Sequence, residues 1–146
     1  MVMDDRAAFE RISTAICGWG KEEQAKGSRL GQLMARFEER YLREGRDTVF
    51  WGAPCLIIAY PKPGRFIPSP RDSAIFSLLY AQLYAPALGL GTCWSGLLEA
   101  AAKHPAVLEA LRPHEPIAIA GAVMAGYPKH AHPRPVAREP ADPTGA

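Results

Sequence analysis

Apolar residues recur at helical spacing in several stretches of the chain, and the longest stretch runs from Asp72 to Gly96. Its first part, DSAIFSLLYAQLYAPAL, predicts a helix that meets Pro86 late in its length, with Ser69 and Asp72 as candidate caps. We expect this central helix to be buried. The stretch closes in GLGTCWSG (Gly89 to Gly96), whose density of glycine predicts a turn.

Helical spacing also appears before and after this stretch. The first helix is expected from Asp5 to about Gly18, where glycine offers a stop, and a polar connection, WGKEEQAKG, follows it. A second helix is expected over 28–45, capped by a serine and ended by a glycine. Two short helices are expected after the glycine-rich turn, at Leu97–Lys103 and from Pro105 through Leu111.

Two unbroken apolar runs have the length and composition of buried strands. They are Cys55 to Tyr60, bounded by prolines, and Glu115 to Ala125, EPIAIAGAVMA. A Pro-rich loop (61–70) follows the first run, and a Pro-rich extended tail (129–146) follows the second. Two strands among four or five helices predict a single domain of the α+β or α/β sandwich class, although two strands make a small sheet.

Composition and charge narrow the function classes. A net charge of +2, with 17 Lys and Arg interleaved among 15 Asp and Glu, leaves no basic stripe and argues against nucleic-acid binding. No stretch reaches the roughly 18 continuous apolar residues of a membrane span, and the first residues do not resemble a signal peptide. Three distant cysteines predict reduced thiols in a cytoplasmic protein. The His130–His132 pair lacks a carboxylate or thiol at ligand spacing, so we expect no metal.

The segment GLGTCWSG is the strongest chemical signal. Its glycines permit positive φ and close approach to a ligand, and its backbone N–H groups lie just before the helix expected near Leu97. Such groups hold anionic oxygens or hydrogen-bond the edge of a heterocycle. The alternative is that the glycines only end one helix and let a strand start. The spacing does not match GxGxxG after a strand, which rejects a dinucleotide-binding turn.

Two side chains in this segment have competing interpretations. Cys93 is either a reactive thiol near a helix start or, as we favour, a packing residue. Trp94 either stacks on an aromatic ligand or fills the core or a dimer interface.

Three separated motifs, in order, resemble the nitroreductase family. They are GAPCLIIAY from Gly52, the central stretch from Asp72, and GAVMAGYPKHAHPRPVAR from Gly121. The resemblance covers about 50–138, the C-terminal two thirds of the family. It implies an FMN-dependent oxidoreductase with an α+β sandwich fold and an intertwined homodimer. In such enzymes hydride passes from NAD(P)H through the flavin to a nitroaromatic, quinone or similar acceptor.

The resemblance also implies residue roles. The segment Cys93, Trp94, Ser95 and Gly96 matches the part of the family that lies along the flavin ring. The segment after GYP supplies cations to the FMN phosphate, with Arg134 as first choice, Arg138 as second and His132 beside them. The alternative is that these charges solvate a Pro-rich tail.

One feature of the family is missing from the sequence. The N-terminal RRSxRxF-type motif and the following Pro-Ser and Asn-x-Gln, which grip FMN, do not occur. The resemblance therefore implies a chain truncated at its N-terminus, a degenerate member, or a flavin site completed by a partner chain. The competing hypotheses are a non-catalytic packing or dimerisation module without flavin, and a small-molecule binding domain with another ligand.

Overall fold

The computed structural model describes residues 1–62, 64, 68–112 and 118–130, and its centre is an antiparallel sheet. The strands lie in the order β1-β2-β4-β3, and every neighbouring pair is antiparallel. Their bounds are β1 Val2–Met3, β2 Cys55–Ala59, β3 Gly91–Trp94 and β4 Gly121–Gly126. The described residues thus form two strands more than the sequence predicted, because β1 and β3 are too short to show a strand pattern.

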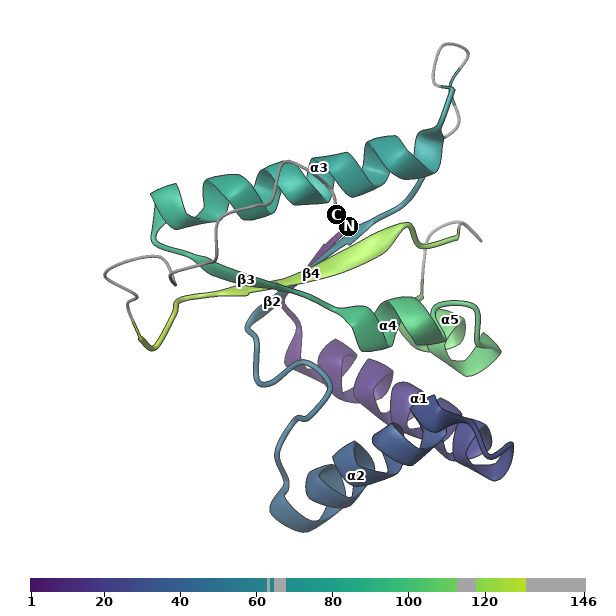
Figure 1. Ribbon diagram of the computed structural model, residues 1–146. Coiled ribbons are helices and arrows are strands. Elements are labelled where there is room, and N and C mark those ends of the chain that lie inside the picture. The colour runs from purple at the N-terminus through teal and green to yellow at the C-terminus, as the bar shows by residue number, and fades with distance from the viewer. Residues whose placement is uncertain (63, 65–67, 113–117, 131–146) are drawn as a thin grey trace, which may run out of the picture.

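Helices cover both faces of this sheet (Figure 1). One face carries α3 (Pro70–Tyr84) and the 3₁₀ turn η1 (Ala85–Leu88). The other face carries α1 (Arg6–Ala25), α4 (Gly96–Ala101) and α5 (Pro105–Leu111), and α2 (Arg29–Glu44) packs on the outer side of α1. This layered arrangement confirms the predicted α+β sandwich.

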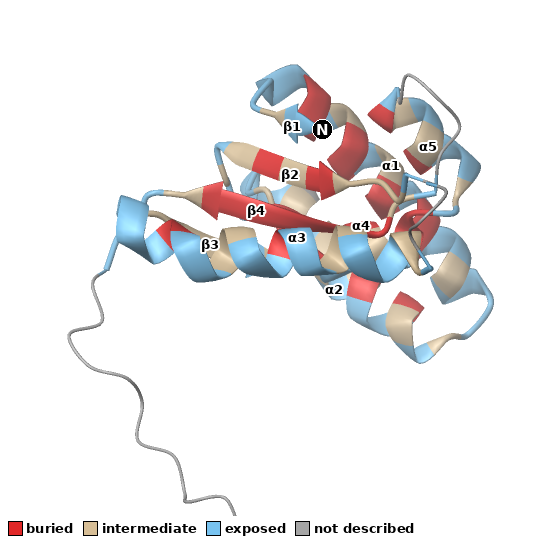
Figure 2. Ribbon diagram, turned by 90° about the horizontal axis from the view of Figure 1, so that it is seen from above, coloured by how far each residue is buried: buried red, intermediate tan, exposed pale blue. Residues whose placement is uncertain are grey.

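The core lies between the sheet and the α1 layer. Strand β4 is buried over nearly its whole length because helices cover both of its faces (Figure 2). Alternate residues of β2 and β4 face α1, and Leu56 pairs with Met124 in the register of the two strands. These side chains join one apolar cluster, whose members include Phe9, Ile12, Ile16, Met34, Phe50, Leu56, Ile58, Leu98, Val107, Ala122 and Met124.

Helix α1 continues well beyond its predicted end at Gly18. It runs to Ala25, so the expected polar connection is its last part. Gly20 serves helix packing, since a Cβ at this position would lie 2.8 Å from the Cβ of Met34 on α2. The second helix agrees with its prediction, because Ser28 accepts a hydrogen bond from Gly31 N and Gly45 ends the helix with a φ of 59°.

Helix α3 is not the buried helix that we expected. Only Leu78 of this helix is buried, against the sheet (Figure 2). Its opposite side exposes large apolar side chains that continue into η1: Phe76, Leu79, Tyr80, Leu83, Tyr84 and Leu88. We call these six residues the α3 patch. Burial of the sheet needs only one side of α3, so the apolar character of the other side has no explanation within the described chain.

The glycine-rich segment is a helix end followed by a strand, which corrects the predicted turn. Gly89 ends η1 with a φ of 71°, Leu90 N donates to Ala85 O, and β3 begins at Gly91. Helices α4 and α5 lie where the sequence predicted them. Strand β4 starts only at Gly121, whereas the prediction began at Glu115, which lies outside the described residues. In the described part of the chain, no helix is long and apolar enough to cross a membrane.

Candidate functional site

Three segments that are far apart in the sequence line one open groove of about 470 Å³. They are the turn Phe50–Pro54, the strand residues Gly91–Cys93, and Met124–Pro128 at the end of β4. The strand order places β4 between β2 and β3, so the end of β4 forms the floor, β3 one wall, and the turn before β2 the other wall. The groove opens on the face of the sheet that α1 covers, beside the core residue Met124.

The groove is mostly apolar and has aromatic rims. Cys93 pairs with Met124 in the register of β3 and β4, so both side chains lie on the same face. The side chains of Trp51 and Tyr127 are 59% and 84% exposed. Strand β3 is at the edge of the described sheet, and its outer backbone groups have no strand partner there. An apolar slot beside free backbone donors and acceptors suits a planar ring system with a polar edge.

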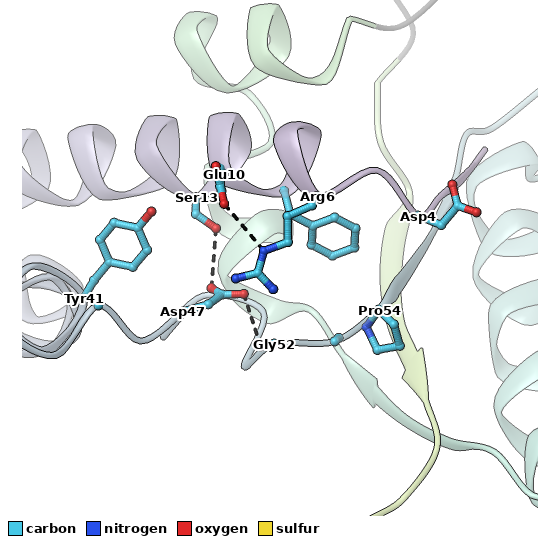
Figure 3. A pocket seen from close by; sticks show the side chains of 11 residues that line it. Asp4, Arg6, Glu10, Ser13, Tyr41, Asp47, Gly52 and Pro54 are labelled. Carbon is cyan, nitrogen blue, oxygen red and sulfur yellow. Dashed lines mark hydrogen bonds and ion pairs between the residues drawn. The ribbon is translucent and has the colours of Figure 1, made fainter.

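The wall formed by Phe50–Pro54 is held by Asp47 (Figure 3). The Asp47 carboxylate accepts hydrogen bonds from three backbone N–H groups, Val49 at 3.0 Å, Phe50 at 2.9 Å and Gly52 at 3.2 Å. It also accepts from the hydroxyl of buried Ser13 on α1, at 3.5 Å. These bonds fix the turn relative to α1, so the position of the wall does not depend on a bound ligand.

A second hollow of about 450 Å³ lies behind this turn and has a different character. Charged and polar residues line it, including Asp4, Arg6, Glu10, Ser13, Tyr41 and Asp47 (Figure 3). Arg6 and Glu10 form an exposed ion pair at 3.5 Å, which is worth little in water. An apolar ring therefore fits the groove better than this hollow.

A comparison with family models decides the identity of the fold. The model of the nitroreductase family matches residues 2–127. The chain belongs to the nitroreductase family. The match includes α1 and α2, which the sequence motifs alone did not reach.

Several solved structures share the fold of this chain. A nitroreductase with bound FMN from Bacteroides fragilis NCTC 9343 is 20% identical, has a TM-score of 0.65, and is matched over 99% of this chain and 72% of its own. A nitroreductase with bound FMN from Desulfitobacterium hafniense DCB-2 is 20% identical with a TM-score of 0.60, over 94% and 70%. A BluB-like flavoprotein from Clostridium difficile 630 is 21% identical with a TM-score of 0.56, over 95% and 74%. No curated protein matches the sequence significantly.

The nitroreductase fold separates the four residues that the sequence grouped along a ring. Cys93 is exposed and lines the groove, which corrects our interpretation of it as a packing residue. Trp94 points to the opposite face of the sheet, where its ring covers Gly121 and its Nε1 donates to Glu99 at 2.8 Å. Ser95 is buried, with its N–H bonded to Ala122 O and no partner for its Oγ among the described residues. Gly96 is exposed and begins α4.

The cationic part of the predicted site cannot be placed in the same way. His132, Arg134 and Arg138 lie outside the described residues, and their roles stay predictions. The chain that leads to them starts beside the groove, because Pro128 lies on Gly91. Among the described residues no group of three His, Cys, Asp or Glu side chains is placed to hold a metal ion.

Sequence reasoning missed the residues of the groove wall. Asp47, Trp51 and Tyr127 are not among the predicted site residues, although the motif GAPCLIIAY begins directly after Trp51. A signal was present in Asp47, because an Asp shortly before a Gly-containing turn is a common acceptor for turn N–H groups.

The other two thiols of this nitroreductase-family chain are kept protonated. Burial raises the pKa of Cys17 to about 11, and nearby Glu38 adds to this effect. Burial also raises the pKa of Cys55. Neither thiol is suited to act as a nucleophile near neutral pH.

Proposed function

We propose that this chain is an FMN-dependent oxidoreductase that transfers a hydride from NAD(P)H, by way of the flavin, to a nitroaromatic, quinone or similar acceptor. The observation that carries the proposal is that the three family motifs, distant in the sequence, line one groove. Separate strands of the sheet bring them together, so their shared position is not a consequence of local sequence.

The residues of the groove fit the ring of FMN. The apolar floor at Met124 and the aromatic rim at Tyr127 suit a flat tricyclic ring, and the edge of β3 offers backbone groups to its polar side. The phosphate requires cations. Lys129 follows Pro128 at the end of the groove, and Arg134, Arg138 and His132 are the predicted further contacts.

FMN supplies the redox chemistry when it is bound, by accepting two electrons as a hydride and passing them on. The balanced reaction with a quinone consumes NAD(P)H and one proton and yields the quinol and NAD(P)⁺. The protein binds and orients the ring, limits the access of water and leaves one side of the slot open. This division of labour requires no acidic or nucleophilic side chain, in keeping with the protonated Cys17 and Cys55.

The proposal includes a homodimer in the cytoplasm. The α3 patch is an apolar surface on the face of the sheet opposite the groove, and it is larger than the single exposed apolar residues that are normal on monomers. The competing function, a module that dimerises without flavin, is favoured by the same patch.

The test is a titration of the purified, flavin-free protein with FMN, followed by the visible absorbance and quenched fluorescence of the bound flavin. We expect saturable binding, and we expect Cys93→Trp to weaken it at least tenfold by filling the groove. Val2→Trp is the matched control, because Val2 is exposed on the opposite edge strand, β1. A folded, colourless protein that does not take up FMN would leave the dimerisation module as the function of this chain. If Cys93→Trp bound FMN as tightly as the wild type, the flavin would not lie in the groove.

A further inference from the structure

The backbone of Trp51 has a conformation that bulky residues rarely adopt. Its φ is 57° and that of Gly52 is 72°, while Ala53 N donates to Phe50 O at 3.0 Å. Positive φ at both central residues is the pattern of a type I′ turn, which favours Asn or Gly at these positions. A tryptophan at the first of them is strained, and such strain persists only where the surroundings enforce it.

Hydrogen bonds around Trp51 hold its backbone in this strained conformation. Asp47 accepts hydrogen bonds from the N–H groups on both sides, Phe50 and Gly52, and so closes the turn around residue 51. The carboxylate is itself tied to Ser13 of α1. The turn would form at least as easily with glycine at position 51, so the turn alone does not explain the indole.

The position of the indole suggests why a tryptophan stands at this point of the turn. Its ring and the ring of Phe37 on α2 form an edge-to-face pair, with centroids 6.3 Å apart and planes at 86°, which fixes the indole from one side. More than half of the side chain remains exposed, and it lines the groove across β4 from Gly91 and Cys93. A large, fixed and exposed aromatic surface on the wall of a slot is the usual means of holding a flat aromatic molecule.

We propose that Trp51 is a specificity-determining residue, whose indole packs against planar aromatic electron acceptors in the groove. Asp47 is its positioning residue, because it holds the strained turn that presents the ring. The inference rests on the proposed function, since it assumes that the acceptor approaches a flavin bound in the same groove. It deepens that function by assigning preference for flat aromatic acceptors to one side chain.

The experiment compares the FMN-loaded wild type with Trp51→Gly and Trp51→Phe. Glycine keeps the turn and relieves its strain, so this variant removes the ring without unfolding the wall. We expect Trp51→Gly to raise the KM for menadione roughly threefold to tenfold, the size of an aromatic packing contact, and Trp51→Phe to retain most of the wild-type affinity. With ferricyanide, which has no aromatic ring, KM should rise less than with menadione, so the ratio of the two KM values should change. An unchanged KM for menadione in Trp51→Gly would refute the proposal.

A binding measurement separates this inference from the proposed function. Flavin-free protein is titrated with menadione in a calorimeter, and the Kd is compared between the wild type and Trp51→Gly. We expect the Kd for menadione to rise roughly threefold to tenfold in the variant, even if FMN itself does not bind. If Trp51→Gly instead loses affinity for FMN and keeps its affinity for menadione, Trp51 contacts the cofactor and the proposal is wrong.

The positioning role of Asp47 has its own readout. Asp47→Ala should raise the KM for menadione relative to the KM for ferricyanide, as Trp51→Gly does. In the double variant the two effects should not add, because both remove the same ring from the groove. Additive effects would show that Asp47 acts independently of Trp51.

Discussion

The indole of Trp94 lies directly over Gly121. A side chain at position 121 would collide with this ring. The ring is also held by its hydrogen bond to Glu99, which pairs with Arg71 of α3 at 3.3 Å. We therefore expect Gly121→Ala to lower the free energy of unfolding by about 1–3 kcal/mol through overpacking. Urea denaturation followed by circular dichroism measures this change.

Gly18→Ala is the control for that substitution. A Cβ at Gly18 in α1 would meet nothing within 4 Å, so alanine should stabilise the helix by about 0.5–1 kcal/mol. Replacing Trp94 by Phe should relieve part of the penalty at position 121, and a penalty of the same size in both backgrounds would contradict the assigned contact.

Residue-scale features were predictable where their causes are local. Ser28 and Gly45 were identified as caps from the sequence because a cap depends on its immediate neighbours. The packing of Trp94 depends on Gly121, which is far along the chain and adjacent only through the pairing of β3 with β4. For that reason the sequence left two interpretations of Trp94 open, and the structure supports its packing role.

At the scale of elements, α3 has an apolar side that the sheet does not cover. The α3 patch includes Leu83, whose side chain is 69% exposed. If the patch is the dimer surface, Leu83→Glu should convert the protein to a monomer, since it places a charge in an apolar interface. Analytical ultracentrifugation of wild type and variant at the same concentration measures the change.

Leu33→Glu on α2 provides the matched control, because Leu33 is also an exposed leucine on a helix but lies outside the patch. It should leave the sedimentation of the protein unchanged. A wild type that sediments as a monomer at tens of micromolar would contradict the proposed dimer, and the patch would then need another partner.

The helices were more predictable than the strands. Helical spacing placed α2, α4 and α5 correctly because each helix forms its hydrogen bonds within itself. Strands β1 and β3 were missed because their hydrogen bonds are made to β2 and β4. A segment of two or four residues contains no pattern that identifies such a partner. The predicted end of α1 was wrong because Gly18 lies inside the helix, and the packing of Gly20 against Met34 of α2 lies beyond it.

At the scale of the whole molecule, the groove and the α3 patch lie on opposite faces of one buried strand, β4. The groove was predictable only in part. The three motifs were recognised from the resemblance, but their meeting depends on the strand order, and the wall with Trp51 depends on the Asp47 hydrogen bonds. Neither the strand order nor these bonds follow from spacing along the chain.

Ligand-linked stability tests the site as a whole. A ligand at a hundredfold excess over its Kd stabilises the folded state by about 2.7 kcal/mol, which corresponds to a rise in Tm of about 5–10 °C for a chain of this size. We expect FMN to produce such a rise in thermal unfolding experiments. Riboflavin at the same concentration should produce a smaller rise, because it lacks the phosphate that the predicted cations bind.

The difference between FMN and riboflavin isolates the phosphate contacts from the ring contacts. If Arg134 binds the phosphate, Arg134→Ala should bring the Tm rise with FMN down to that with riboflavin, whereas Arg36→Ala, on the exposed side of α2, should not. Adenosine monophosphate carries a phosphate without a flavin and controls for general anion binding. A rise with adenosine monophosphate equal to that with FMN would show that the protein recognises the phosphate alone, and the groove would then have no part in binding the ring.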